Sequence, residues 1–126
     1  MKIAVLGAGM VGRAIALDLA DDFTVTSFDI NKRNLQMIED RNSSINTRYA
    51  DLVQYENYKE WLEPYDIVVT AVPGFMGFKT LKTVIEAGKN VADISFFPED
   101  VFQLQKIAEE KKVTVITDIG VAPGLS

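Results

Sequence analysis

Two residue types that often carry chemistry are absent from this chain of 126 residues, which has no cysteine and no histidine. The lack of cysteine excludes disulfide bonds, thiol nucleophiles and thiolate metal sites. The lack of histidine removes the commonest metal ligand and the commonest proton shuttle at neutral pH. We therefore expect no metal site, and any proton transfer has to use other side chains.

Long apolar runs and clusters of basic residues are also missing. No apolar run approaches the roughly 20 residues that a membrane-spanning helix needs. The 13 basic residues are scattered among 18 acidic ones, for a net charge of -5, whereas nucleic-acid-binding surfaces concentrate positive charge. We expect neither a membrane nor a nucleic acid as a partner. With 48% hydrophobic residues and no signal peptide before the first apolar segment, the composition indicates a globular, cytoplasmic protein that binds small molecules.

What the chain does have is a glycine-rich segment near its start, in which Gly7, Gly9 and Gly12 follow the spacing G-x-G-x-x-G. An apolar run precedes it and apolar residues at helical spacing follow it, so the segment joins a strand to a helix. In such a turn the first glycine permits the tight bend, the second lets the backbone approach a pyrophosphate, and the third lets the helix pack on the strand. The helix N-terminus then offers backbone N–H groups to the phosphates, from Met10, Val11 and Gly12. The segment predicts a dinucleotide site, and the alternative is a turn that binds nothing.

Asp29 ends the second expected strand and follows the last glycine of the motif by 17 positions. A carboxylate at about this distance accepts hydrogen bonds from the adenosine ribose hydroxyls. Its negative charge disfavours the 2′-phosphate of NADP, so we expect NAD to be the preferred cofactor. Lys32 and Arg33 keep NADP as an alternative. Their simpler interpretation is solvated charge behind a helix cap at Asn31.

Strand and helix patterns alternate along the whole chain. We expect strands at 3–6, 23–28, 45–49, 66–72, 90–93 and 113–117. Helical spacing lies between them, the later segments being 31–40, 52–62, 76–87 and 98–111. This alternation predicts an α/β fold, a Rossmann doubly wound parallel sheet with strand order 3-2-1-4-5-6 and helices on both faces. Residues 1–117 would form this domain, and the apolar, turn-rich residues 118–126 are interpreted as the start of a severed interdomain crossover.

Small and polar residues follow the third and fourth expected strands, at the edge where a doubly wound sheet binds its ligands. Asp51 and Leu52 would flank the adenine. Val72, Pro73 and Gly74 would line the path toward the nicotinamide. The alternatives are a helix cap at the aspartate and a simple turn at the proline and glycine.

Four segments carry a more specific signal: G-A-G-M-V-G-R-A-I-A, T-A-V-P-G-F-M-G-F-K-T, V-A-D-I-S-F and D-I-G-V-A-P-G-L-S. Together they resemble the saccharopine dehydrogenase family, and within it most closely the lysine 6-dehydrogenases. The resemblance implies a longer parent, a homo-oligomer, whose second domain is absent here and binds an amino-acid substrate. It implies an NAD(P)-dependent oxidoreductase acting on CH–NH or CH–NH2 groups, with hydride transfer at a C–N bond of a lysine-type substrate.

The same resemblance places Asp93 and Ser95 at the nicotinamide end of the site. The serine alternatively satisfies only local backbone groups. Removal of a proton from the substrate nitrogen needs a base, for which Asp93 and Asp118 are the local candidates. Nothing in the sequence distinguishes either of them as that base, so no catalytic residue is assigned. Phe75 and Phe78 are interpreted as core or domain-interface residues rather than as groups that stack on the cofactor.

Two other classes of protein share the glycine segment. A stand-alone NAD(H)-sensing regulatory domain would have the same loop and the same acidic residue, but it has no use for an apolar crossover at its end. A short-chain reductase would need a Tyr-x-x-x-Lys pair late in the sheet. Tyr55 and Lys59 have that spacing but precede the fourth strand, which disfavours this class.

Overall fold

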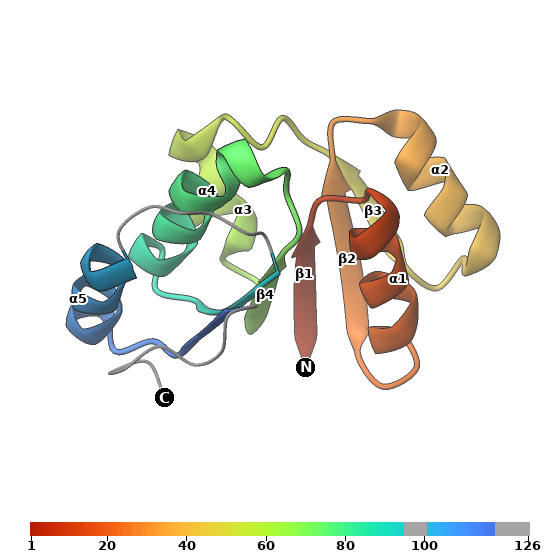
Figure 1. The fold of residues 1–126 in the computed structure, drawn as a ribbon. Helices are drawn as coiled ribbons and strands as arrows, with labels where there is room; N and C mark the ends of the chain where they lie inside the picture. The colour runs from red at the N-terminus through yellow and green to blue at the C-terminus, as the bar shows by residue number, and fades with distance from the viewer. Residues whose placement is uncertain (95–100, 118–126) are drawn as a thin grey trace.

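A computed structural model describes residues 1–94 and 101–117 of the chain. Six parallel strands form one sheet in the order β3-β2-β1-β4-β5-β6 (Figure 1). The strands are β1 Lys2–Leu6, β2 Thr24–Asp29, β3 Asn46–Tyr49, β4 Ile67–Thr70, β5 Asn90–Asp93 and β6 Val115–Thr117. Because β1 pairs with both β2 and β4, the chain leaves it in one direction across the sheet and later returns to its other side. The doubly wound fold predicted from the sequence is confirmed.

Helices cover both faces of this sheet (Figure 1). They are α1 Met10–Leu19, α2 Lys32–Arg41, α3 Tyr58–Leu62, α4 Gly74–Glu86 and α5 Val101–Lys111, with a 3-10 turn η1 at Tyr55–Asn57. Alternation along β1 divides the core. Ile3 and Val5 belong to the cluster beneath α1 and α2, whereas Ala4 and Leu6 belong to the cluster beneath α3, α4 and α5. Such two-sided burial is what the β-branched and apolar strands predict.

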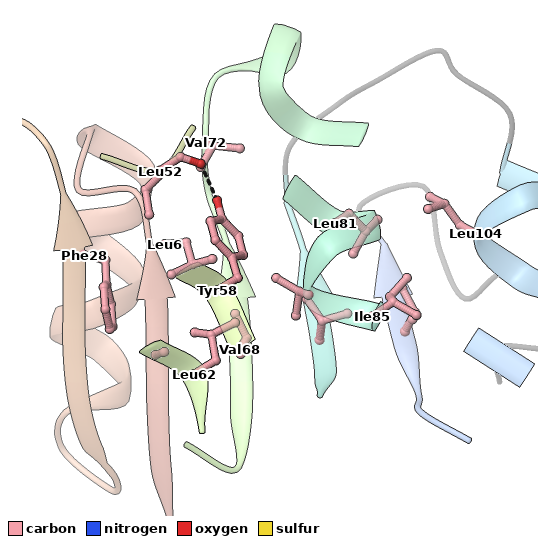
Figure 2. Packing of buried hydrophobic residues seen from close by; sticks show 14 of the residues in the cluster. Leu6, Phe28, Leu52, Tyr58, Leu62, Val68, Val72, Leu81, Ile85 and Leu104 are labelled. Atoms are coloured by element: carbon pink, nitrogen blue, oxygen red, sulfur yellow. Dashed lines mark hydrogen bonds between the residues drawn. The ribbon is translucent and has the colours of Figure 1, made fainter. Parts of the chain in front are cut away.

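The larger cluster reaches the loop that follows β3. Figure 2 shows Tyr58 beside Leu6 in this cluster, with its hydroxyl directed at Leu52. The Tyr58 hydroxyl donates to the Leu52 carbonyl oxygen at 2.6 Å, and burial raises the pKa of this phenol well above its ordinary value. The buried ring therefore fixes the position of the loop at residues 51–54, which lies at the edge of the sheet where ligands bind.

Several boundaries differ from the sequence prediction. The segment 52–62 is a 3-10 turn followed by a five-residue helix rather than one helix, because its apolar residues have mixed spacing. Strand β4 is shorter than expected, and α4 begins directly at Gly74 after Pro73. Residues 95–100 and 118–126 lie outside the described part of the chain, and with them Ser95, Asp118 and the predicted crossover.

Candidate functional site

A cleft with a volume of about 610 Å³ opens at the carboxyl ends of β1, β2 and β4. This is the point where the connections from β1 diverge, which is where doubly wound sheets bind ligands. Eleven residues predicted from the sequence line it: Gly7, Gly9, Met10, Val11, Gly12, Asp29, Asn31, Asp51, Leu52, Val72 and Pro73. The structure thus brings together residues from four separate segments, which follow β1, β2, β3 and β4.

The three glycines of the motif have different neighbours. Gly7 has a φ of +105°, and a Cβ atom there would lie 2.4 Å from the Ala71 carbonyl oxygen. A Cβ atom at Gly12 would lie 2.1 Å from the Gly7 carbonyl oxygen. At Gly9 an added Cβ would lie within 4 Å of no atom of the described residues. The protein's own packing therefore requires the first and third glycines, whereas the open space at the second suits a ligand close to the backbone.

The N-terminus of α1 points into this open space. The first hydrogen bond of the helix runs from the Arg13 N–H to the Gly9 carbonyl oxygen at 2.8 Å, so the N–H groups of the first turn precede the intrahelical ladder. Among residues 1–94 and 101–117, no side chain caps this end of α1, and the first turn of the helix contains no acidic residue. These N–H groups and the positive end of the helix dipole form a site for an anionic group.

Asp29 lies beside the glycine loop at the end of β2. Its Oδ2 atom accepts a hydrogen bond from the Ala8 N–H at 2.6 Å, and its Oδ1 atom accepts one from the Asn31 N–H at 2.7 Å. Each carboxylate oxygen has two lone pairs, so each can accept one more donor. Asp29 can therefore hold the loop and still accept hydrogen bonds from two hydroxyl groups of a ligand.

Basic side chains lie near Asp29 on the exposed start of α2. Lys32 holds its ammonium 5.0 Å from the ring centroid of Tyr49, and Tyr49 is the β3 partner of Asp29 in the strand register. Arg33 is exposed on the same helical turn. The predicted cap is confirmed, because the Asn31 side chain accepts from the Asn34 N–H at 3.1 Å.

The two walls of the cleft are formed by loops after β3 and β4. On one wall Asp51 accepts from the Val53 N–H at 3.2 Å, which is a local turn. It does not cap a helix, as the alternative interpretation had it, because Gln54 and Asn57 are the N-cap residues of η1 and α3. On the other wall, Val72 and Pro73 line the cleft. Gly74 begins α4 and is not among the lining residues.

Asp93 lies deeper in the protein than the other predicted site residues. It ends β5, is 2% exposed, and accepts a hydrogen bond from the Thr70 hydroxyl at 2.5 Å. It does not line the cleft. A role for Asp93 toward a cofactor stays a prediction, as does that of Ser95.

Six further residues line the cleft that the sequence reasoning did not assign to it: Ile30, Asn34, Val53, Ala71, Phe75 and Met76. Phe75 is 86% exposed, which excludes the core position considered for it, while Phe78 packs against the core. Most of the six flank a predicted site residue in the sequence. Asn34 lies one helical turn beyond Asn31, a spacing that could have indicated it.

The described residues hold no group of three metal-ligating side chains. Across residues 1–94 and 101–117, no helix has the length and apolar character to span a bilayer. The cleft, with a glycine cradle, an uncapped helix N-terminus and a carboxylate at the end of β2, defines a dinucleotide-binding domain of the Rossmann class.

The comparison with known families agrees. The family described as saccharopine dehydrogenase NADP binding domain matches residues 3–116. The chain belongs to this family, and it is an oxidoreductase-type domain that binds an NAD(P) cofactor.

Solved structures of dehydrogenases share the fold. Apo saccharopine dehydrogenase (L-Glu forming) from Saccharomyces cerevisiae is 23% identical with a TM-score of 0.80, and the match covers 98% of this chain and 28% of that one. GenD2 from gentamicin A biosynthesis, solved with NAD, is 22% identical with a TM-score of 0.72, covering 93% and 34%. A probable dehydrogenase from Thermotoga maritima is 19% identical with a TM-score of 0.76, covering 94% and 36%. The chain thus spans about a third or less of each of these proteins.

Proposed function

We propose that this chain is the cofactor-binding domain of an oxidoreductase that transfers a hydride between NAD(P) and a C–N bond of a lysine-type amino acid. The observation that carries the proposal is the open space at Gly9 between the N-terminus of α1 and the Asp29 carboxylate. The membership in the saccharopine dehydrogenase NADP-binding domain family supports it.

Each group of residues in the cleft would bind a different part of the cofactor. The first-turn N–H groups of α1 would hold the pyrophosphate, and the remaining lone pairs of Asp29 would accept from the ribose hydroxyls. The wall formed by Asp51 and Leu52 would flank the adenine, and the wall formed by Val72 and Pro73 would guide the nicotinamide. When bound, the nicotinamide ring accepts or donates the hydride, so the protein's contribution here is to bind and orient it.

NAD is the proposed preferred cofactor. A 2′-phosphate would sit against the Asp29 carboxylate, and like charges at short range repel. Lys32 and Arg33 are the residues that would offset this repulsion if Asp29 turned aside. The two backbone N–H groups that hold Asp29 oppose such a turn, which favours NAD.

We propose that substrate binding and proton transfer belong to a second domain rather than to this one. The chain spans 28% of the yeast saccharopine dehydrogenase that it matches. We infer that a second domain binds the amino-acid substrate and supplies the proton-transferring group, and that the parent is a cytoplasmic homo-oligomer. By itself the present chain would bind cofactor without oxidising lysine.

The test is titration calorimetry of the chain with NADH and with NADPH. We expect the unsubstituted chain to bind NADH saturably and NADPH more weakly. In Asp29→Ala the dissociation constant for NADH should rise by about tenfold or more. Asp22→Ala is the matched control, because Asp22 is an exposed aspartate in the loop before β2. Equal binding by the two variants would contradict the role of Asp29. Lysine-dependent formation of NADH by this chain alone would contradict the assignment of catalysis to a second domain.

A further inference from the structure

Five residues around the glycine loop form a closed ring of hydrogen bonds. Asp29 accepts from the Ala8 N–H at 2.6 Å and from the Asn31 N–H at 2.7 Å. The Asn31 side chain accepts from the Asn34 N–H at 3.1 Å. Arg13 closes the ring, because one guanidinium nitrogen donates to the Asn34 Oδ1 atom at 3.3 Å and to the Ala8 carbonyl oxygen at 3.4 Å.

The ring fixes the residue between the first two glycines of the motif. The N–H of Ala8 is bound by the Asp29 carboxylate and its carbonyl by the Arg13 guanidinium, so both of its backbone polar groups have charged partners. Hydrogen bonds to charged groups are stronger than those between neutral ones. Glycines on both sides would otherwise leave this stretch with many accessible conformations.

Arg13 occupies a position that is electrostatically unfavourable for a cation. It is the fourth residue of α1, directly after the first-turn N–H groups and near the positive end of the helix dipole, where acidic residues are stabilising. Arg13 does not line the cleft, whereas its partner Asn34 does. Arg13 donates to two acceptors in the ring, one in the loop and the other on α2. We infer that these two hydrogen bonds offset the unfavourable interaction of its charge with the helix dipole.

We propose that Arg13 is a positioning residue for the dinucleotide, which joins the loop that binds the pyrophosphate to the carboxylate that binds the ribose. The inference rests on the proposed cofactor binding. With the ring closed, the N–H groups around Gly9 and the free lone pairs of Asp29 are held in one arrangement before the ligand arrives. Binding then costs less ordering of the loop, which is the benefit of preorganisation.

The first test needs no ligand and measures hydrogen exchange of the Ala8 amide by NMR. In Arg13→Met we expect this amide to exchange about tenfold faster than in the unsubstituted chain, because the loop opens more often. Arg41→Met is the control, since it removes the same charge at the far, exposed end of α2. Arg13→Lys keeps the charge, so the Ala8 amide should exchange more slowly in this variant than in Arg13→Met but faster than in the unsubstituted chain. If Arg13→Met does not fold, Arg13→Lys takes its place in the comparison.

The second test measures NADH affinity by calorimetry, at a temperature where circular dichroism shows each variant to be folded. We expect Arg13→Met to weaken binding about tenfold and Asn34→Ala about threefold. The double variant should be no weaker than Arg13→Met alone, because both substitutions open the same ring. A structural role without positioning would lower the melting temperature and leave the affinity unchanged.

Three results would overturn the inference. The first is an unchanged Ala8 exchange rate in Arg13→Met. The second is an unchanged NADH affinity in that variant. The third is a double variant weakened about thirtyfold, the product of the single effects, which would make Arg13 and Asn34 independent contacts of the cofactor. Absence of NADH binding by the unsubstituted chain is a different failure, since it would overturn the proposed function on which the inference rests.

Discussion

Substitution of Gly12 by alanine should mainly lower stability, whereas substitution of Gly9 by alanine should mainly weaken cofactor binding. At Gly12 the new methyl group would lie 2.1 Å from the Gly7 carbonyl oxygen and 2.9 Å from the carbonyl carbon. Both are backbone atoms of the tight turn, where Gly7 already has a φ of +105°, so α1 has to move away from the sheet. Overpacking of this kind costs about 3 kcal/mol, the upper part of the usual range. For a domain of this size the melting temperature should fall by roughly 10 °C.

At Gly9 the same methyl group meets no atom within 4 Å in the part of the chain that the structure describes. The backbone there has φ −68° and ψ −170°, which alanine adopts without strain. The stability cost should stay below about 1 kcal/mol, because alanine in place of a preferred N-cap residue costs about 1 kcal/mol and glycine in its place only a few tenths. The methyl group would instead occupy the space of the pyrophosphate, so the dissociation constant for NADH should rise by about thirtyfold.

Thermal unfolding followed by circular dichroism and titration with NADH separate these effects. Gly9→Ala should unfold close to the unsubstituted chain and bind poorly, whereas Gly12→Ala should unfold early. If Gly9→Ala binds NADH normally, the phosphates do not approach the backbone at this glycine. If Gly12→Ala unfolds at the unsubstituted temperature, the close contact between α1 and the loop does not restrict the fold.

Two further predictions are tested by measurements of stability. Asn31→Ala removes the side-chain cap from the Asn34 N–H and should lower the free energy of unfolding by about 1 kcal/mol in urea titrations; an unchanged midpoint would refute the cap. Burial raises the pKa of Tyr58 in the folded state, so the phenol of the unfolded chain loses its proton at a lower pH than that of the folded chain. The contribution of the Tyr58 phenol to the free energy of unfolding is therefore fully present below about pH 10 and decreases as the pH rises above it. Tyr58→Phe should therefore lose less stability between neutral pH and pH 11 than the unsubstituted chain does, and an identical pH dependence of the two would contradict the burial of the phenol.

Much of the fold could be predicted because it depends on local patterns. The apolar runs of β1 and β4, the glycines after β1 and the helical spacing between strands are all short-range features, and the strand order follows from the right-handed crossovers. The cap at Asn31 and the aspartate at the end of β2 were predicted on the same basis. The segment 52–62 was less tractable, since its apolar residues fit more than one helical period.

The parts that could not be predicted depend on contacts between distant segments. Nothing in the sequence around Arg13 indicates that it contacts Asn34 on the next helix, 21 positions away. The exposure of Phe75 at the mouth of the cleft depends on where α4 begins relative to Pro73. Likewise, the burial of Asp93 could not be predicted from the sequence of β5, because it depends on the pairing of β5 with β4 and β6. These side chains are placed by packing across the sheet rather than by local pattern.

Mapping of backbone amide shifts during titration with NADH tests the central claim most directly. The account predicts saturable shifts at the amides of Gly9, Met10 and Val11 together with the Asp29 to Asn31 turn, while the polar hollow lined by Asn46 and Thr47 on β3 stays unchanged. Shifts confined to that hollow, or no shifts at millimolar NADH, would contradict the assignment of this cleft to a dinucleotide.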